Sequence, residues 1–78
     1  MTMYRIYFDA NKWDGQRYSL GVPGALRDIE PIADKLTEGM RVIIYMPDEL
    51  EMHATLEFDA KDNKWWARPI DGTTRLLH

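Results

Sequence analysis

The chain has 78 residues, of which 45% are hydrophobic and 29% charged, and its formal net charge is −3. This length allows one domain, residues 1–78, with a single small core, and the apolar content is too high for a disordered chain. The acidic balance disfavours a general nucleic-acid binder, because such proteins gain most of their affinity by neutralising phosphates. Cysteine is absent, which excludes disulfides and thiolate zinc sites and favours a reducing, cytoplasmic location.

Neither export nor a membrane span is expected. Residues 1–8 carry Arg5 inside their only apolar run and so lack the hydrophobic segment of a signal peptide. Nowhere does an apolar run reach the roughly 18 residues that a membrane helix needs. We therefore expect no membrane partner.

The N-terminal segment predicts a hairpin. Residues 3–8 (MYRIYF) alternate between an apolar face and a mixed face, which is the period of a strand. Residues 9–16 are rich in turn formers and include an Asp-Gly pair, so they should return the chain into a second strand at 17–20. The first two strands are thus expected to pair with each other.

A turn and a short helix are expected next. Pro23 and Gly24 suit the two central positions of a type II turn, because Pro sets φ near −65° and Gly permits positive φ. Asp28 then offers an N-cap, apolar residues recur at helical spacing, and Gly39 supplies a C-terminal stop. The sequence predicts one amphipathic helix over about 29–37 that packs on the sheet or plugs the end of a barrel.

The second half of the chain predicts a meander. Residues 40–46 read as a strand that is apolar on both sides, and residues 50–58 alternate strictly between apolar and polar side chains. A polar loop leads into a further strand at 64–69 (KWWARP), and a last extended piece is expected at 73–76. The predicted element order is β-β-α-β-β-β.

The pairing of the last two long strands can be predicted residue by residue. If Asp59 pairs with Lys64 across a four-residue loop, Phe58 faces Trp65 and two apolar faces meet. Trp66 must then point outward. A two-residue change in loop length preserves this parity, whereas a one-residue slip would exchange the two tryptophans.

These elements predict an α+β fold that is mainly β. Several short strands and one helix in so small a chain favour a small curved antiparallel sheet or a partly open SH3-like or OB-like barrel with the helix packed on it.

A repeated phrase, FDANKW at 8–13 and FDAKDNKW at 58–65, raises the question of a calcium site. A calcium loop needs oxygen ligands at positions 1, 3 and 5 and glycine at position 6. In the first copy Trp13 falls at position 5 and Asp14 at position 6, and the second copy fits less well. Both phrases are better interpreted as one turn device, in which Asp and Asn bond to their own backbone.

The outward sheet face is the predicted binding surface. Its strand positions combine arginines, aromatics and carboxylates, and Trp, Tyr and Arg are the residues that most often anchor protein interfaces. The alternative is a face with no partner, covered in part by the helix and satisfied by cross-strand Arg–Glu and cation–π pairs. The candidate residues are Arg5, Tyr7, Arg41, Tyr45, His53, Trp66 and Arg68.

The leading functional hypothesis is a small non-enzymatic interaction or regulatory module that docks another protein through this face. The second is single-stranded nucleic-acid binding, with Tyr7, Tyr45 and Trp66 as stacking platforms; the carboxylates and the net charge oppose it. A third is a small enzyme centred on His53. A strand sets His53 and its carboxylate neighbours side by side instead of converging on a cleft, so the third hypothesis is the weakest.

No cofactor and no metal are expected. A zinc site would depend almost wholly on carboxylates, since His53 and the terminal His78 are the only histidines. The loop from Gly21 to Gly24 lacks the lysine and the Ser/Thr of a phosphate-binding loop and is expected to be a plain turn.

Overall fold

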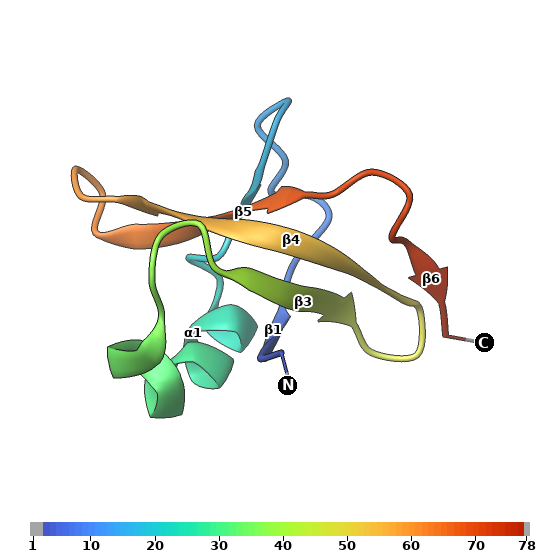
Figure 1. The fold of residues 1–78 in the computed structure, drawn as a ribbon, viewed down its shortest axis with the longest axis horizontal. Coiled ribbons are helices and arrows are strands. Elements are labelled where there is room, and N and C mark those ends of the chain that lie inside the picture. The colour runs from blue at the N-terminus through green and yellow to red at the C-terminus, as the bar shows by residue number, and fades with distance from the viewer. Residues whose placement is uncertain (1–2, 78) are drawn as a thin grey trace.

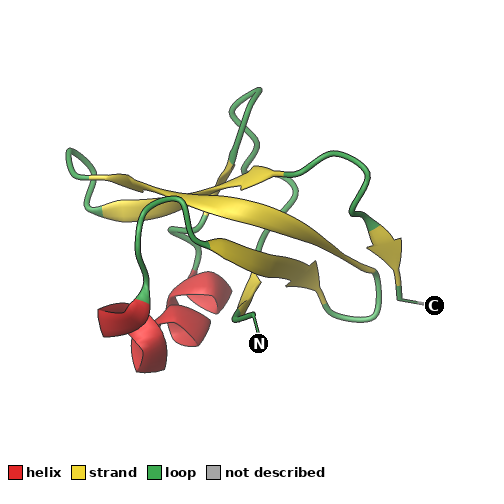
Figure 2. Cartoon of the chain, in the orientation of Figure 1, coloured by secondary structure: helices red, strands yellow, loops and turns green. Residues whose placement is uncertain are grey.

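The protein is described from a computed structural model that covers residues 3–77, so His78 lies outside the described residues. One strongly curled sheet forms most of the fold, with a short helical segment packed on one side (Figures 1 and 2). The elements in chain order are β1 (Arg5–Tyr7), β2 (Tyr18–Ser19), α1 (Pro23–Ile29), the 3-10 helix η1 (Glu30–Lys35), β3 (Arg41–Met46), β4 (Leu50–Asp59), β5 (Lys64–Pro69) and β6 (Arg75–Leu76).

This architecture confirms the predicted fold class, mainly β with one short helical region, and the predicted element order. The strands follow the spatial order β1-β3-β4-β5-β2, and β6 pairs with the part of β4 that extends beyond β5. The predicted final extended piece at 73–76 is therefore present as β6. Among the described residues, no helix is long and apolar enough to cross a membrane.

The predicted hairpin between the first two strands is wrong. β1 instead runs parallel to β3, with Ile6 opposite Ile44, and β2 runs antiparallel to β5. A parallel pair needs a long crossover, which the segment containing α1 and η1 supplies. The turn-rich segment 9–17 folds back on itself instead, so that Trp13 and Tyr18 form an isolated bridge. The sheet is thus mixed, with one parallel pairing.

The helical segment begins earlier than the sequence predicts. Pro23 occupies the first helical turn and Gly24 lies inside α1, so the predicted type II turn is wrong. The φ angle that suits Pro to a turn suits the start of a helix equally well. At Pro31, which has no N–H to donate to Arg27, the chain continues as the 3-10 helix η1. Asp28 is therefore not an N-cap.

The hairpin of β4 and β5 has the predicted register. Asp59 lies opposite Lys64, Phe58 opposite Trp65, and Leu56 opposite Ala67. The Phe58 and Trp65 rings are in contact, with centroids 4.9 Å apart. Short-range pairing and period-two alternation determine this register together.

The core lies between the inner face of the curled sheet and α1. Alternate residues of β1, β3 and β4 point inward and meet the two buried residues of the helix, Ala25 and Ile29. Phe58 belongs to the inner set but is 39% exposed, because it lies at the end of the β4–β5 hairpin. The buried apolar residues are Ile6, Phe8, Leu20, Ala25, Ile29, Leu36, Val42, Ile44, Met52, Ala54, Leu56 and Ala67.

Candidate functional site

The outer sheet face carries all seven candidate residues, but the structure divides them into separate groups. Arg5, Tyr7 and Tyr45 gather at the β1–β3 side, and Trp66 and Arg68 lie on β5 at the other side. His53 and Arg41 occupy β4 and β3 positions between these groups, opposite Ile43 and Thr55 respectively.

We call the first group the tyrosine cluster (Arg5, Tyr7, Tyr45, Glu51 and Asp28). Its aromatic and charged side chains contact one another. Tyr7 and Tyr45 meet edge to face, with ring centroids 6.3 Å apart. The Arg5 guanidinium lies 4.8 Å from the centre of the Tyr45 ring and 2.7 Å from a Glu51 carboxylate oxygen. A single Asp28 oxygen accepts hydrogen bonds from the Tyr45 hydroxyl and the Tyr7 backbone N–H. The helix, which packs on the inner face, thus reaches the β1 edge of this cluster through Asp28.

The second group, the tryptophan cluster (Arg17, Glu57, Lys64, Trp66 and Arg68), has two cations over the Trp66 ring. The Arg17 guanidinium lies 4.5 Å, and the Lys64 ammonium 4.7 Å, from the centre of the Trp66 ring. Arg17 also bonds Glu57 at 3.0 Å, and Arg68 bonds the same carboxylate at 2.5 Å. These pairs are the cross-strand Arg–Glu and cation–π contacts that the sequence alternative describes.

Arg17 is a site residue that the sequence analysis missed. The sequence predicts that the strand containing Arg17 pairs with β1, whereas it pairs with β5. The sheet face on which Arg17 lies therefore could not be predicted. Once β2 pairs with β5, with Tyr18 opposite Ala67 and Ser19 opposite Trp66, the neighbouring Arg17 reaches Trp66 and Glu57. The pairing of β2 with β5 is thus the information needed to identify Arg17 as a site residue, and the composition of segment 9–17 does not supply it.

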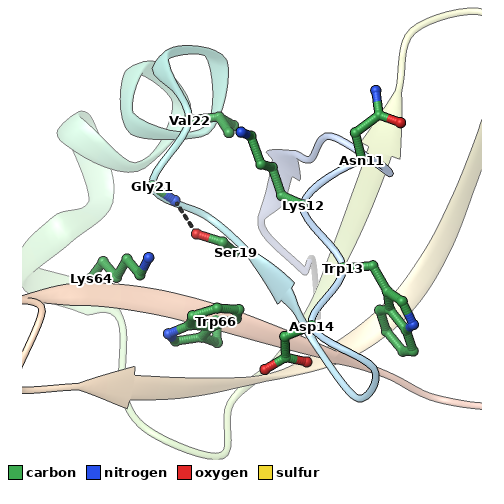
Figure 3. A pocket seen from close by; sticks show the side chains of 9 residues that line it. All are labelled: Asn11, Lys12, Trp13, Asp14, Ser19, Gly21, Val22, Lys64 and Trp66. Carbon is green, nitrogen blue, oxygen red and sulfur yellow. Dashed lines mark hydrogen bonds between the residues drawn. The ribbon is translucent and has the colours of Figure 1, made fainter.

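Beside Trp66 the surface is hollowed into a depression of about 490 Å³ (Figure 3). One side is the loop that carries Asn11, Lys12, Trp13 and Asp14, and the other is β5 with Lys64 and Trp66. Ser19, Gly21 and Val22 lie between the two sides. We call this feature the Trp66 depression.

The Trp66 depression exists because small residues stand next to a large one. Ser19, the direct cross-strand partner of Trp66, is nearly buried and accepts the Gly21 backbone N–H on its hydroxyl oxygen at 3.2 Å. At Gly21 an added Cβ would lie 3.2 Å from Cδ of Lys64, so the absence of a side chain leaves room for the Lys64 stem. That stem places the ammonium over the Trp66 ring.

The two copies of the repeated phrase meet at this depression. The first copy contributes Asn11, Lys12 and Trp13, and the second contributes Lys64. Their shared role as turn devices is confirmed: Asp9 accepts the Asn11 backbone N–H, and Asp59 accepts those of the residues two and three positions further on. Each copy thus delivers one lysine to the same hollow.

The charges around the depression are unequally compensated. Asp14 accepts the backbone N–H groups of Gln16 and Arg17, which lower the pKa of its carboxyl, and Arg17 lies 3.5 Å from its second oxygen. By contrast, neither Lys12 nor Lys64 forms an ion pair with any of the residues 3–77. The unpaired charge of the hollow is therefore positive.

Trp66 keeps its indole N–H away from bulk water. Nε1 is buried and makes no hydrogen bond within the described part of the chain. The backbone N–H of Asp62 is the main cause that lowers the pKa of the Asp59 carboxyl, and the indole N–H of Trp66 lowers this pKa further. The polar edge of Trp66 is thus turned away from the solvent, and Arg17 and Lys64 lie over its ring.

His53 does not line the Trp66 depression. Its backbone N–H donates to the Thr73 hydroxyl oxygen at 3.0 Å, and its Nδ1 is buried without a hydrogen-bond partner in residues 3–77. Over the same residues, no group of three or more His, Cys, Asp or Glu side chains is arranged to hold a metal ion.

The fold and this site define a small, mainly β, α+β domain with a hollow on the outer side of its sheet that is lined by Lys12, Lys64, Trp13 and Trp66, among others. No protein-family model, curated protein or solved structure matches the chain significantly.

Proposed function

We propose that the chain is a non-enzymatic module that binds another protein, and that the Trp66 depression is the docking point. The observation that carries the proposal is the position of Trp66 in a hollow beside the small residues Ser19 and Gly21. Interface hot spots are enriched in Trp and Arg and lie in pockets that exclude water on binding. A partner side chain entering this hollow would contact the part of Trp66 that lines it.

The remainder of the outer face supports the choice of this location. In the tyrosine cluster, Arg5 is paired with Glu51 and Tyr45 with Asp28. A partner would have to break these internal contacts to use the same groups, and desolvated polar groups left without partners reduce affinity. Lys12 and Lys64 form no ion pair within residues 3–77, so a partner could bind them without breaking one.

Single-stranded nucleic-acid binding is the second candidate, favoured by the two unpaired lysines beside an aromatic ring. Two observations make it the weaker one. Arg17 and Lys64 already lie over the Trp66 ring, where a stacking base would need to sit. In addition, Asp14 lines the hollow, and Glu57 and Asp59 lie opposite Trp66 and Lys64 on β4, so these carboxylates would repel a polyphosphate chain.

The test is a selection of random peptides displayed on particles and captured by the immobilised protein. Peptides that bind the wild-type chain but lose affinity for Trp66→Ala support docking at the depression. Arg41→Ala serves as the matched control, because Arg41 is exposed on the same sheet face outside the hollow. The proposal fails if no peptide depends on Trp66, or if short oligonucleotides bind there and displace every selected peptide.

Each variant must remain folded for this comparison. Trp66 lies on the outer face, away from the buried core, so Trp66→Ala is expected to retain the backbone spectrum of the wild-type chain. Trp66→Phe provides a second variant that keeps an aromatic ring in the hollow. Peptide affinity should fall in the order wild type, Trp66→Phe, Trp66→Ala.

A further inference from the structure

We infer that the Trp66 depression binds an acidic segment of the partner, with one or more carboxylates held between Lys12 and Lys64. The inference rests on the proposed function and specifies the chemistry of its ligand. Figure 3 shows the two lysines coming from different sides of the hollow, Lys12 from the loop and Lys64 from β5. A carboxylate in the hollow would meet both ammonium groups.

The positive charge of the hollow comes from its two lysines, because the neighbouring arginines are paired with carboxylates. Arg17 is neutralised by Glu57 and Asp14, and Arg68 is neutralised by Glu57. Of the four cations in or beside the hollow, Lys12 and Lys64 are the two that form no ion pair with a carboxylate of residues 3–77. An entering carboxylate would therefore gain two ion pairs without displacing an existing one, and charge-assisted hydrogen bonds are about twice as strong as neutral ones.

The polar groups of the hollow add donors to these charges. The Ser19 oxygen already accepts the Gly21 N–H, which leaves its hydroxyl hydrogen free to donate. Asn11 also lines the hollow, and its side-chain amide makes no hydrogen bond within residues 3–77. A carboxylate accepts several hydrogen bonds at once and donates none, so it matches this excess of donors.

The surrounding carboxylates limit the size of the anion. Asp14 and Asp59 lie at the loop side and the hairpin side, and the whole chain is acidic. A short segment can place one or two carboxylates on the lysines while its remaining residues stay clear of these acids. A long polyanion cannot, because its charges repeat at every residue.

The structure also indicates what should flank the carboxylate. Val22 lines the hollow, and the Trp66 ring forms its aromatic side. Burying an apolar side chain against such groups is favourable by about 25 cal/mol for each Å² removed from water. The best ligand is thus an acidic segment with an aliphatic or aromatic residue next to the carboxylate.

The test compares the Trp66-dependent peptides of the selection with their neutral counterparts, in which every Asp is replaced by Asn and every Glu by Gln. The selected peptides are expected to be rich in Asp and Glu, and their neutral counterparts to bind at least about tenfold more weakly. Lys12→Gln and Lys64→Gln should each weaken binding about two- to fivefold, the value of an exposed ion pair. Raising the salt concentration should weaken binding further.

Lys35→Gln is the matched control, because Lys35 is an exposed lysine on η1 outside the hollow. It should leave the affinity unchanged. If the Trp66-dependent peptides are neutral or basic, or bind the double variant Lys12→Gln/Lys64→Gln as tightly as wild type, the inference is overturned while the proposed function stands. If no Trp66-dependent peptide is recovered, both are overturned. Tighter binding of an oligothymidylate than of any acidic peptide would assign the lysines to nucleic acid and overturn the inference.

Discussion

The Asp28 carboxylate accepts a hydrogen bond from the Tyr45 hydroxyl at 2.7 Å. The same oxygen accepts the backbone N–H of Tyr7 at 2.9 Å, on the side of β1 that does not face β3. One helix side chain thus joins α1 to two strands and satisfies a donor on an edge strand, where unpaired N–H groups promote aggregation.

Removing this carboxylate should destabilise the fold. Asp28→Ala loses two charge-assisted hydrogen bonds and leaves the Tyr7 N–H without its acceptor, so we expect a loss of about 2–3 kcal/mol in the free energy of unfolding. Tyr45→Phe loses only one of the bonds and should cost about 1 kcal/mol. Urea unfolding measures both. Asp34→Ala, at an exposed position of η1, is the control and should change the free energy of unfolding by less than about 0.5 kcal/mol. An equally small effect of Asp28→Ala would contradict the proposed role of the Asp28 carboxylate.

The same hydrogen bond makes stability depend on alkaline pH. The bond from Tyr45 to Asp28 raises the pKa of the Tyr45 hydroxyl above its ordinary value of 10.0, because a phenolate cannot donate. Its contribution to stability is therefore complete below about pH 10 and is lost as the pH rises through the higher folded-state pKa. The phenolate absorbance of wild type minus that of Tyr45→Phe should report this pKa. Asp28→Asn should bring the pKa back towards the ordinary value, and an unchanged titration in that variant would refute the assignment.

On the acid side, stability should depend on Glu57. The hydrogen bond from Arg68, reinforced by Arg17, holds the pKa of the Glu57 carboxyl below its ordinary value of 4.5. This contribution is present above the unfolded-state pKa and is lost as the pH falls through the lower folded-state pKa. Urea unfolding at a series of pH values from neutral to acid should show a smaller loss for Glu57→Gln than for wild type. Glu49→Gln, at an exposed turn position, should follow the wild-type curve.

Gly24 should resist replacement although it lies in a helix. Alanine normally stabilises a helix by up to about 1 kcal/mol relative to glycine. Here an added Cβ would lie 2.6 Å from Cδ2 of Tyr7, so the Tyr7 ring must move out of its packed position. We expect Gly24→Ala to destabilise the protein by about 1–3 kcal/mol, as overpacking does.

A double-mutant cycle isolates this contact. In a Tyr7→Ala background the ring is absent, and Gly24→Ala should become neutral or stabilising. Arg27→Ala, at an exposed position of the same helix, is the control and should be close to neutral. A stabilising Gly24→Ala in the wild-type background would show that the helix can move away from Tyr7.

The position of the site could be predicted only in part. The parity of the β4–β5 hairpin correctly placed Trp66 on the outer face, because that pairing is local and a one-residue slip would bury the wrong tryptophan. Ser19, Gly21 and Lys12 could not be connected with Trp66, since that connection depends on the pairing of β2 with β5. Without the β2–β5 pairing, the loop that carries Lys12 is not placed beside Trp66, and no hollow can be predicted.

The sequence by itself determined the elements that depend on neighbours along the chain. These are the order of the elements, the inward and outward faces of the long strands, the β4–β5 register and the Asp-based turns of the repeated phrase. Each follows from a period of two or from hydrogen bonds over two or three residues, so the necessary information lies within a few positions.

Only the tertiary structure decided the parallel partner of β1, the start of α1 and the meeting of the two turns. Pro23 and Gly24 satisfy a turn and a helix start equally well, and the packing of Tyr7 against Gly24 favours the helix. The hydrophobic effect that selects among long-range pairings is non-directional, so it depends on the total area that the whole chain buries and leaves no signal in one segment. For that reason Lys12 and Lys64, which are 52 positions apart in the sequence, line a single hollow.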